Sequence, residues 1–263
     1  MIYKNIVHTT GIGDFLAIDS YFNDDEKSKI ENIYFINELS KQNNIKNIIK
    51  SSKKYNPNVN FISLWNNYLD YWDHRRSIIY KNKINLKSTL VDFEFIWGTQ
   101  EYKETKNLKN YYFSKEKLTN IDKFNLPEKF CLIITYTNPE RLFDKRDWQQ
   151  TLKILSFLKI KGVILGQINK LNLNNKNLIN LNKKTSIIEA IEIAKKCSFY
   201  LGIDSFLSIV ASSHLKNDRI QIKTKNKNAT ENFNFYYPCQ KNNKIIRNNI
   251  NFKYFIRNFY KLL

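Results

Sequence analysis

The chain has 263 residues, a mass of 31.5 kDa, and 42% apolar and 14% aromatic residues, which is enough to build at least one buried core. This composition excludes wholesale disorder, and no apolar run reaches the roughly 20 residues that a membrane-spanning helix needs. A total of 43 Lys and Arg against 24 Asp and Glu gives a formal charge of +19. That charge suits an anionic partner such as nucleic acid, a phosphorylated glycan or a membrane surface. Only seven of the cations are arginine, however, and an AT-rich coding sequence produces the same lysine-rich composition without any such partner.

The N-terminus and the cysteines indicate the compartment and the metal content. The first seven residues contain no long apolar stretch and no small-residue cleavage site, so we expect a cytoplasmic protein without a signal peptide. The cysteines at 131, 197 and 239 lack CxxC spacing, and the three histidines lack ligand spacing. We therefore predict no disulfide framework, no metal site and no cofactor. The pair Asp92-x-Glu94 fits an edge strand with alternating acids better than a metal-binding motif.

Strand-like and helix-like patterns alternate along the chain. In the first half, strands are predicted at 2–8, 32–36, 59–64 and 90–96, and helices at 15–22, 37–50 and 65–76. In the second half, strands are predicted at 130–135, 162–165, 178–181, 199–203 and 219–223, and helices at 148–158, 185–196, 206–213 and 250–263. The polar segment between them, 98–127, resembles an inter-domain connection with one short strand at 111–113.

This alternation indicates parallel sheets covered by helices. We predict an α/β protein of two Rossmann-like domains, covering residues 1–125 and 126–249. The aromatic helix at 250–263 is expected to pack back on the N-terminal domain, and contact with the inner face of a membrane is an alternative role for it.

Two glycines and an aspartate follow the first predicted strand, in the sequence Thr10-Gly11-Ile12-Gly13-Asp14. The glycines allow a tight turn, and the start of the next helix attracts anions. The spacing is not GxGxxG, which argues against a dinucleotide site. Asp14 is either an ordinary helix cap or a carboxylate that takes a proton from a hydroxyl at the carboxyl end of a parallel strand.

Hydroxyls and cations occur together after the first strand of the second half. Thr135 and Thr137 end that strand, and Lys145 and Arg146 precede the helix predicted at 148–158. Threonine hydroxyls, cations and helix-start amides together are suited to binding a diphosphate. A loop followed by a solvated charged face would have the same residues, so both interpretations stay open.

Further along, the strand at 199–203 leads into Asp204 and Ser205. Ser and Asp commonly cap a helix at such a turn, and the same turn can place backbone amides on a phosphate and a carboxylate on a sugar hydroxyl. Upstream of it, Thr185 and Ser186 with Glu189 form a spacing close to a capping box.

These motifs, in this order, resemble those of glycosyltransferase family 9, the lipopolysaccharide heptosyltransferases. The segments that carry the resemblance are Gly13-Asp14, Thr135 and Thr137 with Lys145 or Arg146 and Trp148, 163–167, 181–189 and 200–205. The match is best over 130–213. Phe206 and Ile209 stand where the family usually has a glycine and a histidine.

Members of this family have the GT-B fold, in which two Rossmann-like domains with parallel sheets face each other across a cleft and the C-terminal domain holds most of the nucleotide-sugar. They transfer the sugar with inversion and need no metal in the chemical step. The resemblance therefore implies a glycosyltransferase of the hexosyl or heptosyl class with a nucleotide-sugar donor. It also implies a glycan or lipid-linked acceptor, such as lipopolysaccharide or another surface glycan.

The resemblance also implies roles for individual residues. Asp14 would be the general base, in an acceptor loop with Gly11 and Gly13. The expected donor-binding residues are Thr135, Thr137, Lys145, Arg146, Gly166, Gln167, Thr185, Ser186, Asp204 and Ser205. Two alternative functions remain open: a GT-B enzyme acting on modified bases of DNA, which the positive charge would suit, and a non-catalytic binding protein on a degenerate GT-B fold.

Overall fold

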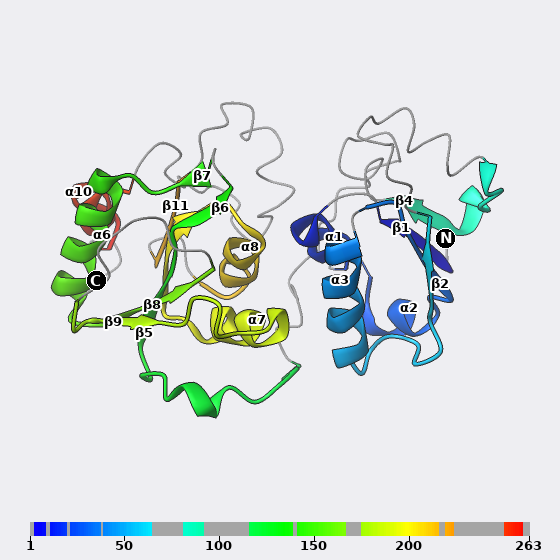
Figure 1. Cartoon of the computed structure of the whole chain (residues 1–263), viewed down its shortest axis with the longest axis horizontal. Helices are drawn as coiled ribbons and strands as arrows, with labels where there is room; N and C mark the ends of the chain where they lie inside the picture. The colour runs from blue at the N-terminus through cyan, green and yellow to red at the C-terminus, as the bar shows by residue number, and fades with distance from the viewer. Residues whose placement is uncertain are drawn as a thin grey trace. The chain divides into compact units, whose positions relative to one another are not determined.

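The computed structural model describes most of the two expected halves (Figure 1). The described residues are 3–8, 11–19, 22–37, 39–64, 81–91, 116–138, 141–166, 175–215, 219–223 and 250–259. The chain divides into two compact units, Met1–Glu116 and Lys117–Leu263. The division falls somewhat before the boundary at residue 125 that the sequence suggested.

The N-terminal unit contains a parallel four-stranded sheet in the order β3-β2-β1-β4. Its strands are β1 (Asn5–His8), β2 (Asn32–Phe35), β3 (Asn60–Ser63) and β4 (Thr89–Val91), and its helices are α1 (Ile12–Asp19), α2 (Asp24–Ser28) and α3 (Leu39–Ser51), with a 3₁₀ turn at Leu86–Ser88. Residues of β1 are buried throughout because the strand is central, whereas β3 at the edge is partly exposed. The predicted helix at 65–76 and the strand at 111–113 lie outside the described residues.

A buried ion pair joins α1 to α2. The Lys27 Nζ donates to Asp19 Oδ2 at 2.8 Å, and the Tyr55 hydroxyl donates to Asp19 Oδ1 at 2.7 Å. All three side chains are almost fully shielded from water. Burial and the neighbouring Asp19 carboxylate raise the pKa of Tyr55, so the phenol keeps its proton for this hydrogen bond.

The C-terminal unit contains a parallel five-stranded sheet in the order β11-β10-β5-β8-β9 and a two-stranded antiparallel ribbon, β6-β7. The strands are β5 (Phe130–Ile134), β6 (Tyr136–Asn138), β7 (Arg141–Leu142), β8 (Lys161–Leu165), β9 (Leu178–Asn180), β10 (Phe199–Ile203) and β11 (Ile220–Lys223). The helices are α6 (Lys145–Leu158), α7 (Ile187–Lys196), α8 (Phe206–Ser212) and α10 (Phe252–Phe259), with a 3₁₀ turn at Asp122–Phe124.

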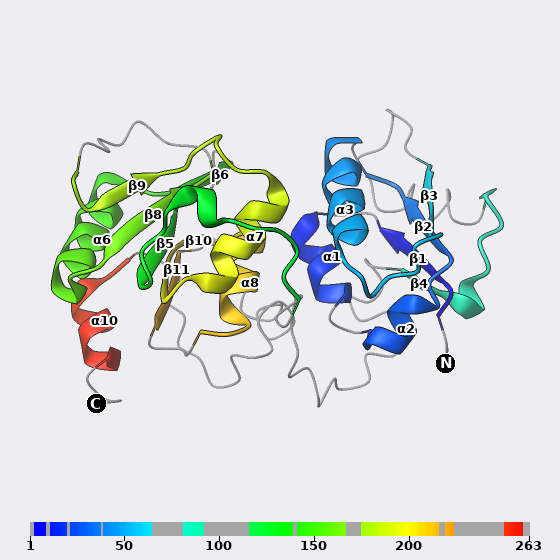
Figure 2. The same ribbon diagram turned by 90° about the horizontal axis from the view of Figure 1, so that it is seen from below.

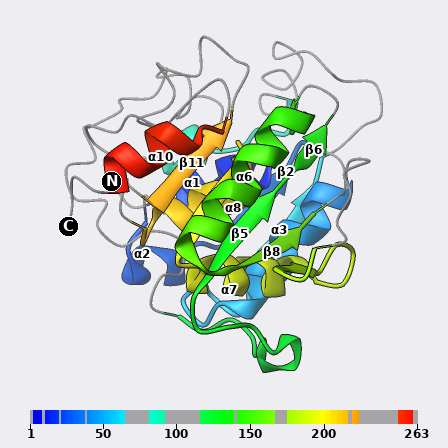
Figure 3. The ribbon, with the colours of Figure 1, turned by 90° about the vertical axis from the view of Figure 1, so that its left-hand side faces the viewer.

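Helices cover both faces of this second sheet. Figures 2 and 3 show α6 and α10 on one face and α7 and α8 on the other. Because both faces are covered, every residue of β5 and β10 is buried, which explains their continuous apolar sequences. The alternation of strands and helices therefore predicted this layered arrangement correctly.

The described contacts of the terminal helix α10 join it to α6 and β10. The Ile250 N–H donates to Asp147 Oδ1 at 2.9 Å, and the Phe252 N–H donates to Gln150 Oε1 at 3.2 Å. The Phe255 ring, on the apolar side of α10, packs against Phe199 of β10. These described contacts lie within the C-terminal unit, and packing of the helix on the N-terminal domain stays a prediction. An amphipathic pattern identifies an apolar face but not the surface that covers it.

Candidate functional site

Both sheets have the strand order of doubly wound α/β proteins. Numbered by their appearance within each sheet, the strands run 3-2-1-4 in the first and 3-2-1-4-5 in the second. In such sheets, ligands bind beyond the carboxyl ends of the strands, at the point where the strand order reverses. That point lies between β1 and β4 in the N-terminal unit, and between β5 and β10 in the C-terminal unit.

The strand register gathers four of the expected donor residues at this edge of the C-terminal sheet. Ile134 of β5 pairs with Gly202 of β10 on one side and with Leu165 of β8 on the other. Thr135, Gly166 and the pair Asp204-Ser205 follow these three strands, so the parallel register brings them to the same edge. They are far apart in the chain, and the sheet, not the spacing in the sequence, assembles the candidate donor site.

Thr135 and Gly166 occupy the two turns that leave β5 and β8. Thr135 is fully buried, and its carbonyl accepts the Phe143 N–H at 2.9 Å, which fixes the start of the β6-β7 ribbon. Gly166 has a φ of 82°, a left-handed conformation that glycine adopts without a steric cost. A backbone turn of this kind leaves room for a ligand to approach the edge of the sheet.

The turn after β10 is held by a buried tyrosine that the sequence analysis did not single out. The Tyr200 hydroxyl donates to the Ile203 carbonyl at 2.6 Å and lies 3.3 Å from Ser205 Oγ. Burial raises the pKa of Tyr200 far above its ordinary value, so the hydroxyl remains a donor. Ser205 caps α8 and accepts the Ser208 N–H. The ordinary interpretation of Ser205 as a helix cap is thus confirmed, and a donor-binding role stays a prediction.

A glycine near the end of β10 makes room for the tyrosine. A Cβ atom on Gly202 would lie 2.8 Å from the Tyr200 hydroxyl and 3.0 Å from the Ile134 carbonyl. Gly202→Ala is therefore expected to lower the free energy of unfolding by about 1–3 kcal/mol through overpacking, measured by urea denaturation.

Gly162→Ala is a matched control for that substitution. The three atoms nearest to a Cβ on Gly162 would be the terminal methyl carbons of Ile133, Leu155 and Leu178, at 2.6, 2.9 and 2.9 Å. These side-chain ends can shift, so we expect a smaller loss of stability than at Gly202. An equal or larger loss at Gly162 would contradict the steric role of Gly202.

The two expected phosphate-binding cations lie in the first turn of α6. Lys145 and Arg146 are exposed and follow the N-cap Asp144, so the helix begins before the predicted start at residue 148. Cations are disfavoured at a helix N-terminus. Asp144 and Asp147 offset them by forming a capping box, in which each side chain accepts the backbone N–H of the other residue.

A buried lysine from β11 reaches the same two carboxylates. Lys223 Nζ contacts Asp144 Oδ2 at 3.2 Å and forms an ion pair with Asp147, whose side chain is fully buried. Although partial burial alone would raise the pKa of Asp144, the Asp147 N–H and Lys223 together lower it. The sequence contained no local signal for this cluster, because Lys223 and Asp147 are 76 positions apart.

Thr185 and Ser186 follow β9, at the edge of the sheet. Ser186 caps α7 and accepts the Glu189 N–H at 3.2 Å, while Glu189 accepts the Ser186 N–H at 2.7 Å. The capping box expected here is confirmed. A role for these two residues in binding the donor stays a prediction.

In the N-terminal unit, the candidate base follows β1. Asp14 is the third residue of α1, and its Oδ2 accepts the Gly11 N–H at 2.8 Å. The carboxylate therefore stabilises the start of the helix from within its first turn, and it is half-buried. In the preceding strand, the fully buried ring of His8 packs edge-on against Phe15 and Phe35.

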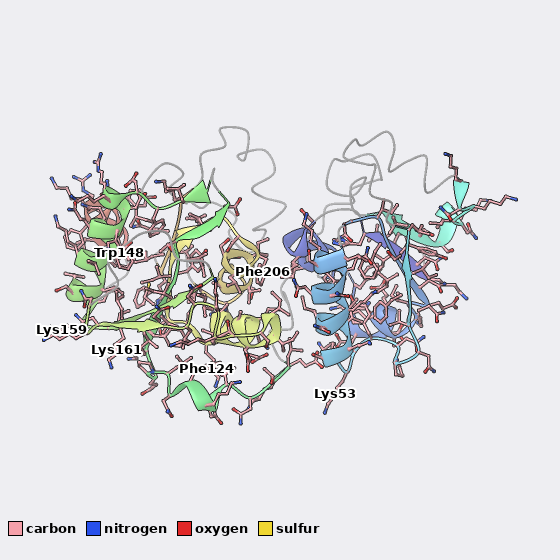
Figure 4. All side chains as sticks on the ribbon, in the orientation of Figure 1. Lys53, Phe124, Trp148, Lys159, Lys161 and Phe206 are labelled. Atoms are coloured by element: carbon pink, nitrogen blue, oxygen red, sulfur yellow. The ribbon has the colours of Figure 1, made fainter. Side chains whose placement is uncertain are left out.

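Some predictions fall on residues that the structure does not describe. Gln167, Cys239 and the Asp92-x-Glu94 pair lie outside the described residues, and only the backbone of Thr137 is described. Figure 4 shows Phe206 at the start of α8, and Ile209 is buried within that helix. The two positions that depart from the family pattern thus belong to the helix that follows the Asp204-Ser205 turn.

The described part of the chain also bears on metal binding, membrane spans and the state of the cysteines. These residues contain no group of three or more His, Cys, Asp or Glu side chains arranged to hold a metal ion. Within the same residues, no helix has the length and apolar character needed to cross a membrane. The two described cysteines, Cys131 and Cys197, are buried and free.

Two doubly wound parallel α/β units define the class of fold to which GT-B proteins belong. Among solved structures, the chain is similar to the crystal structure of the glycosyl transferase family 9 from Veillonella parvula DSM 2008. That similarity has a TM-score of 0.53 and 12% sequence identity, and it covers 100% of this chain and 98% of that chain. It shows a shared fold over both units, so the predicted GT-B fold is confirmed.

A second similarity is to dodecameric iron-containing heptosyltransferase TibC in complex with ADP-D-beta-D-heptose. Its TM-score is 0.43 with 14% identity, covering 84% of this chain and 57% of that chain. TibC from enterotoxigenic E. coli H10407 also matches, with a TM-score of 0.45 and 12% identity, over 84% of this chain and 58% of that chain. No family model and no curated protein matches the sequence.

Proposed function

We propose that the chain is an inverting glycosyltransferase that moves a sugar from a nucleotide-sugar to a hydroxyl of a surface glycan such as lipopolysaccharide. The observation that carries the proposal is the position of Thr135 and Asp204-Ser205 at the switch point of the C-terminal sheet, with Gly166 at the end of the neighbouring strand β8. The family 9 fold, matched over both units, supports the same activity.

In the proposed reaction, the acceptor hydroxyl attacks the anomeric carbon of the donor. The new C–O bond forms as the bond between that carbon and the diphosphate breaks, and Asp14 takes the hydroxyl proton. The nucleoside diphosphate leaves with the electron pair of the broken bond. Attack from the opposite side inverts the configuration of the anomeric carbon.

The leaving diphosphate acquires negative charge during this step. Thr135 and the cations of the first turn of α6, Lys145 and Arg146, are the residues proposed to stabilise it, in place of a metal ion. The backbone turn at Gly166 would border the nucleotide, and the Asp204 carboxylate would accept a hydrogen bond from a sugar hydroxyl. Each contact uses a residue type suited to the group that it would bind.

A panel of nucleotide-sugars tests the proposal by thermal denaturation. We expect at least one donor to stabilise the protein, by about 2.7 kcal/mol when its concentration is a hundredfold above Kd. Thr135→Val, which keeps the side-chain shape but removes the hydroxyl, is expected to reduce that stabilisation.

The matched control is Thr151→Val, because Thr151 is an equally buried threonine in α6 of the same unit. This variant should keep the full response to the donor. If no donor in the panel stabilises the wild-type protein, the glycosyltransferase proposal is wrong and a non-catalytic binding role is favoured.

A further inference from the structure

A groove of about 320 Å³ lies between α6 and the start of α10 in the C-terminal unit. Figure 3 shows these two helices on the same face of the sheet. The residues that line the groove include Arg146, Gln150, Lys153, Ile250, Phe252 and Lys253. Of these, Arg146 belongs to the expected donor set, while Gln150 and Lys153 lie one and two turns further along α6.

The lining is positively charged. Arg146, Lys153 and Lys253 contribute three cations, and no Asp or Glu is among the described residues that line the groove. In the described part of the chain, none of these three cations forms an ion pair. Neighbouring cations without counter-ions repel each other, so an anion bound in the groove would relieve that repulsion.

The carboxylates that lie nearest to these cations in the sequence contact other groups. Asp144 and Asp147, at the start of α6, both pair with the buried Lys223, and Asp147 also accepts the Ile250 N–H. The described part of α10 contains no acidic residue. Lys223 thus pairs with the two carboxylates that could otherwise neutralise the cations of the groove.

The walls of the groove are held together across the two helices. The Phe252 N–H donates to Gln150 Oε1 at 3.2 Å, and the Phe252 ring packs edge-on against Phe157, with ring centroids 5.8 Å apart. The N–H groups of Ile250, Asn251 and Phe252 all donate to side chains. Recognition in the groove therefore depends on its side chains, not on unpaired amides at the start of α10.

We propose that this groove binds a phosphorylated sugar. The three cations would hold the phosphate dianion, and the half-buried Phe252 ring offers an apolar wall for the C–H face of a sugar. Gln150 and Asn251, which also lines the groove, carry carboxamides of the kind that orient a polar ligand. The volume lies at the lower end of the range for small-molecule sites, about 300–1,000 Å³, which favours a small ligand over a polymer. This site is additional to the proposed donor site, with which it shares Arg146.

Isothermal titration calorimetry with glucose 6-phosphate at low salt tests the proposal. We expect glucose 6-phosphate to bind more tightly than inorganic phosphate, and glucose not to bind measurably. The double variant Lys153→Gln/Lys253→Gln is expected to weaken glucose 6-phosphate binding by at least about tenfold, because two of three cations are lost.

The control double variant is Lys129→Gln/Lys161→Gln, which removes the same charge from exposed positions in the same unit. Figure 4 shows Lys161 beyond the C-terminal end of α6. This variant and Ser205→Ala, which alters the proposed donor site, should both retain wild-type affinity for glucose 6-phosphate. Equal weakening in the two double variants would show only a general effect of charge and would overturn the proposal.

Two further probes separate the phosphorylated sugar from other anions. A DNA duplex and phosphatidylglycerol vesicles are each tested against the same two double variants. Binding of either probe that depends on Lys153 and Lys253, without binding of glucose 6-phosphate, would overturn the proposal in favour of that probe's class. Failure of glucose 6-phosphate to bind the wild-type protein would overturn it as well, whatever the result of the nucleotide-sugar panel.

Discussion

Asp14→Asn is expected to lower turnover by about 10²–10⁴-fold, the usual contribution of a general base. The asparagine side-chain oxygen can still accept the Gly11 N–H, which Asp14 accepts at 2.8 Å, so the start of α1 should be preserved. The amide cannot take a proton from the acceptor. Donor binding, measured by calorimetry, should therefore change little while turnover falls.

Turnover can be measured as release of nucleoside diphosphate from the donor that the panel identifies, with water as a slow acceptor. The matched control is Asp24→Asn, which removes a carboxylate from the first turn of α2 in the same unit. It should keep wild-type turnover. Near-wild-type turnover in Asp14→Asn would remove Asp14 from the mechanism.

Lys223→Met is expected to lower the free energy of unfolding by about 3–5 kcal/mol, the cost of leaving a buried carboxylate without its cation. Asp147 is fully buried, and Lys223 is almost fully buried. Among the described residues, removal of the ammonium group would leave Asp147 with two backbone N–H donors, those of Asp144 and Ile250. Urea denaturation at neutral pH measures the loss.

Two further variants show whether the lost charge pairing is the cause. Lys223→Met/Asp147→Asn removes the unpaired charge and should recover part of the loss. Lys123→Met breaks an ion pair with Glu189 in which the lysine side chain is 62% exposed, and exposed pairs contribute only about 0–1 kcal/mol. If Lys223→Met lowers the free energy of unfolding no more than Lys123→Met does, the buried ion pair does not stabilise the C-terminal unit.

Much of the fold was predictable because its signals are local. Apolar runs of four to seven residues separated by helical periods indicated buried parallel strands, and β5, β8, β9, β10 and β11 appear where they were expected. The short helix α2 was missed, since its sequence, DDEKS, has almost no apolar period. Its start carries a capping box between Asn23 and Glu26, which was a usable signal.

The site was predictable only in part. Asp204 and Ser205 were recognised as the turn after a strand. The need for a glycine at position 202 was not, because the Tyr200 side chain that lies over it belongs to the same strand and carries no motif of its own. The pairing of Lys223 with the two acids at the start of α6 was also missed. The cationic groove beside that helix was missed for the same reason, since it depends on the same distant contacts.

The sequence by itself determined the class of fold and the order of its elements, because hydrophobic period and capping residues act over a few neighbouring positions. Only the tertiary structure decided which surface covers α10, which acids Lys223 neutralises and which strands bring Thr135 and Asp204 to one edge of the sheet. These choices depend on contacts between residues far apart in the chain. Their free energy comes from burial and charge pairing in the folded state, and it leaves no pattern in the local sequence.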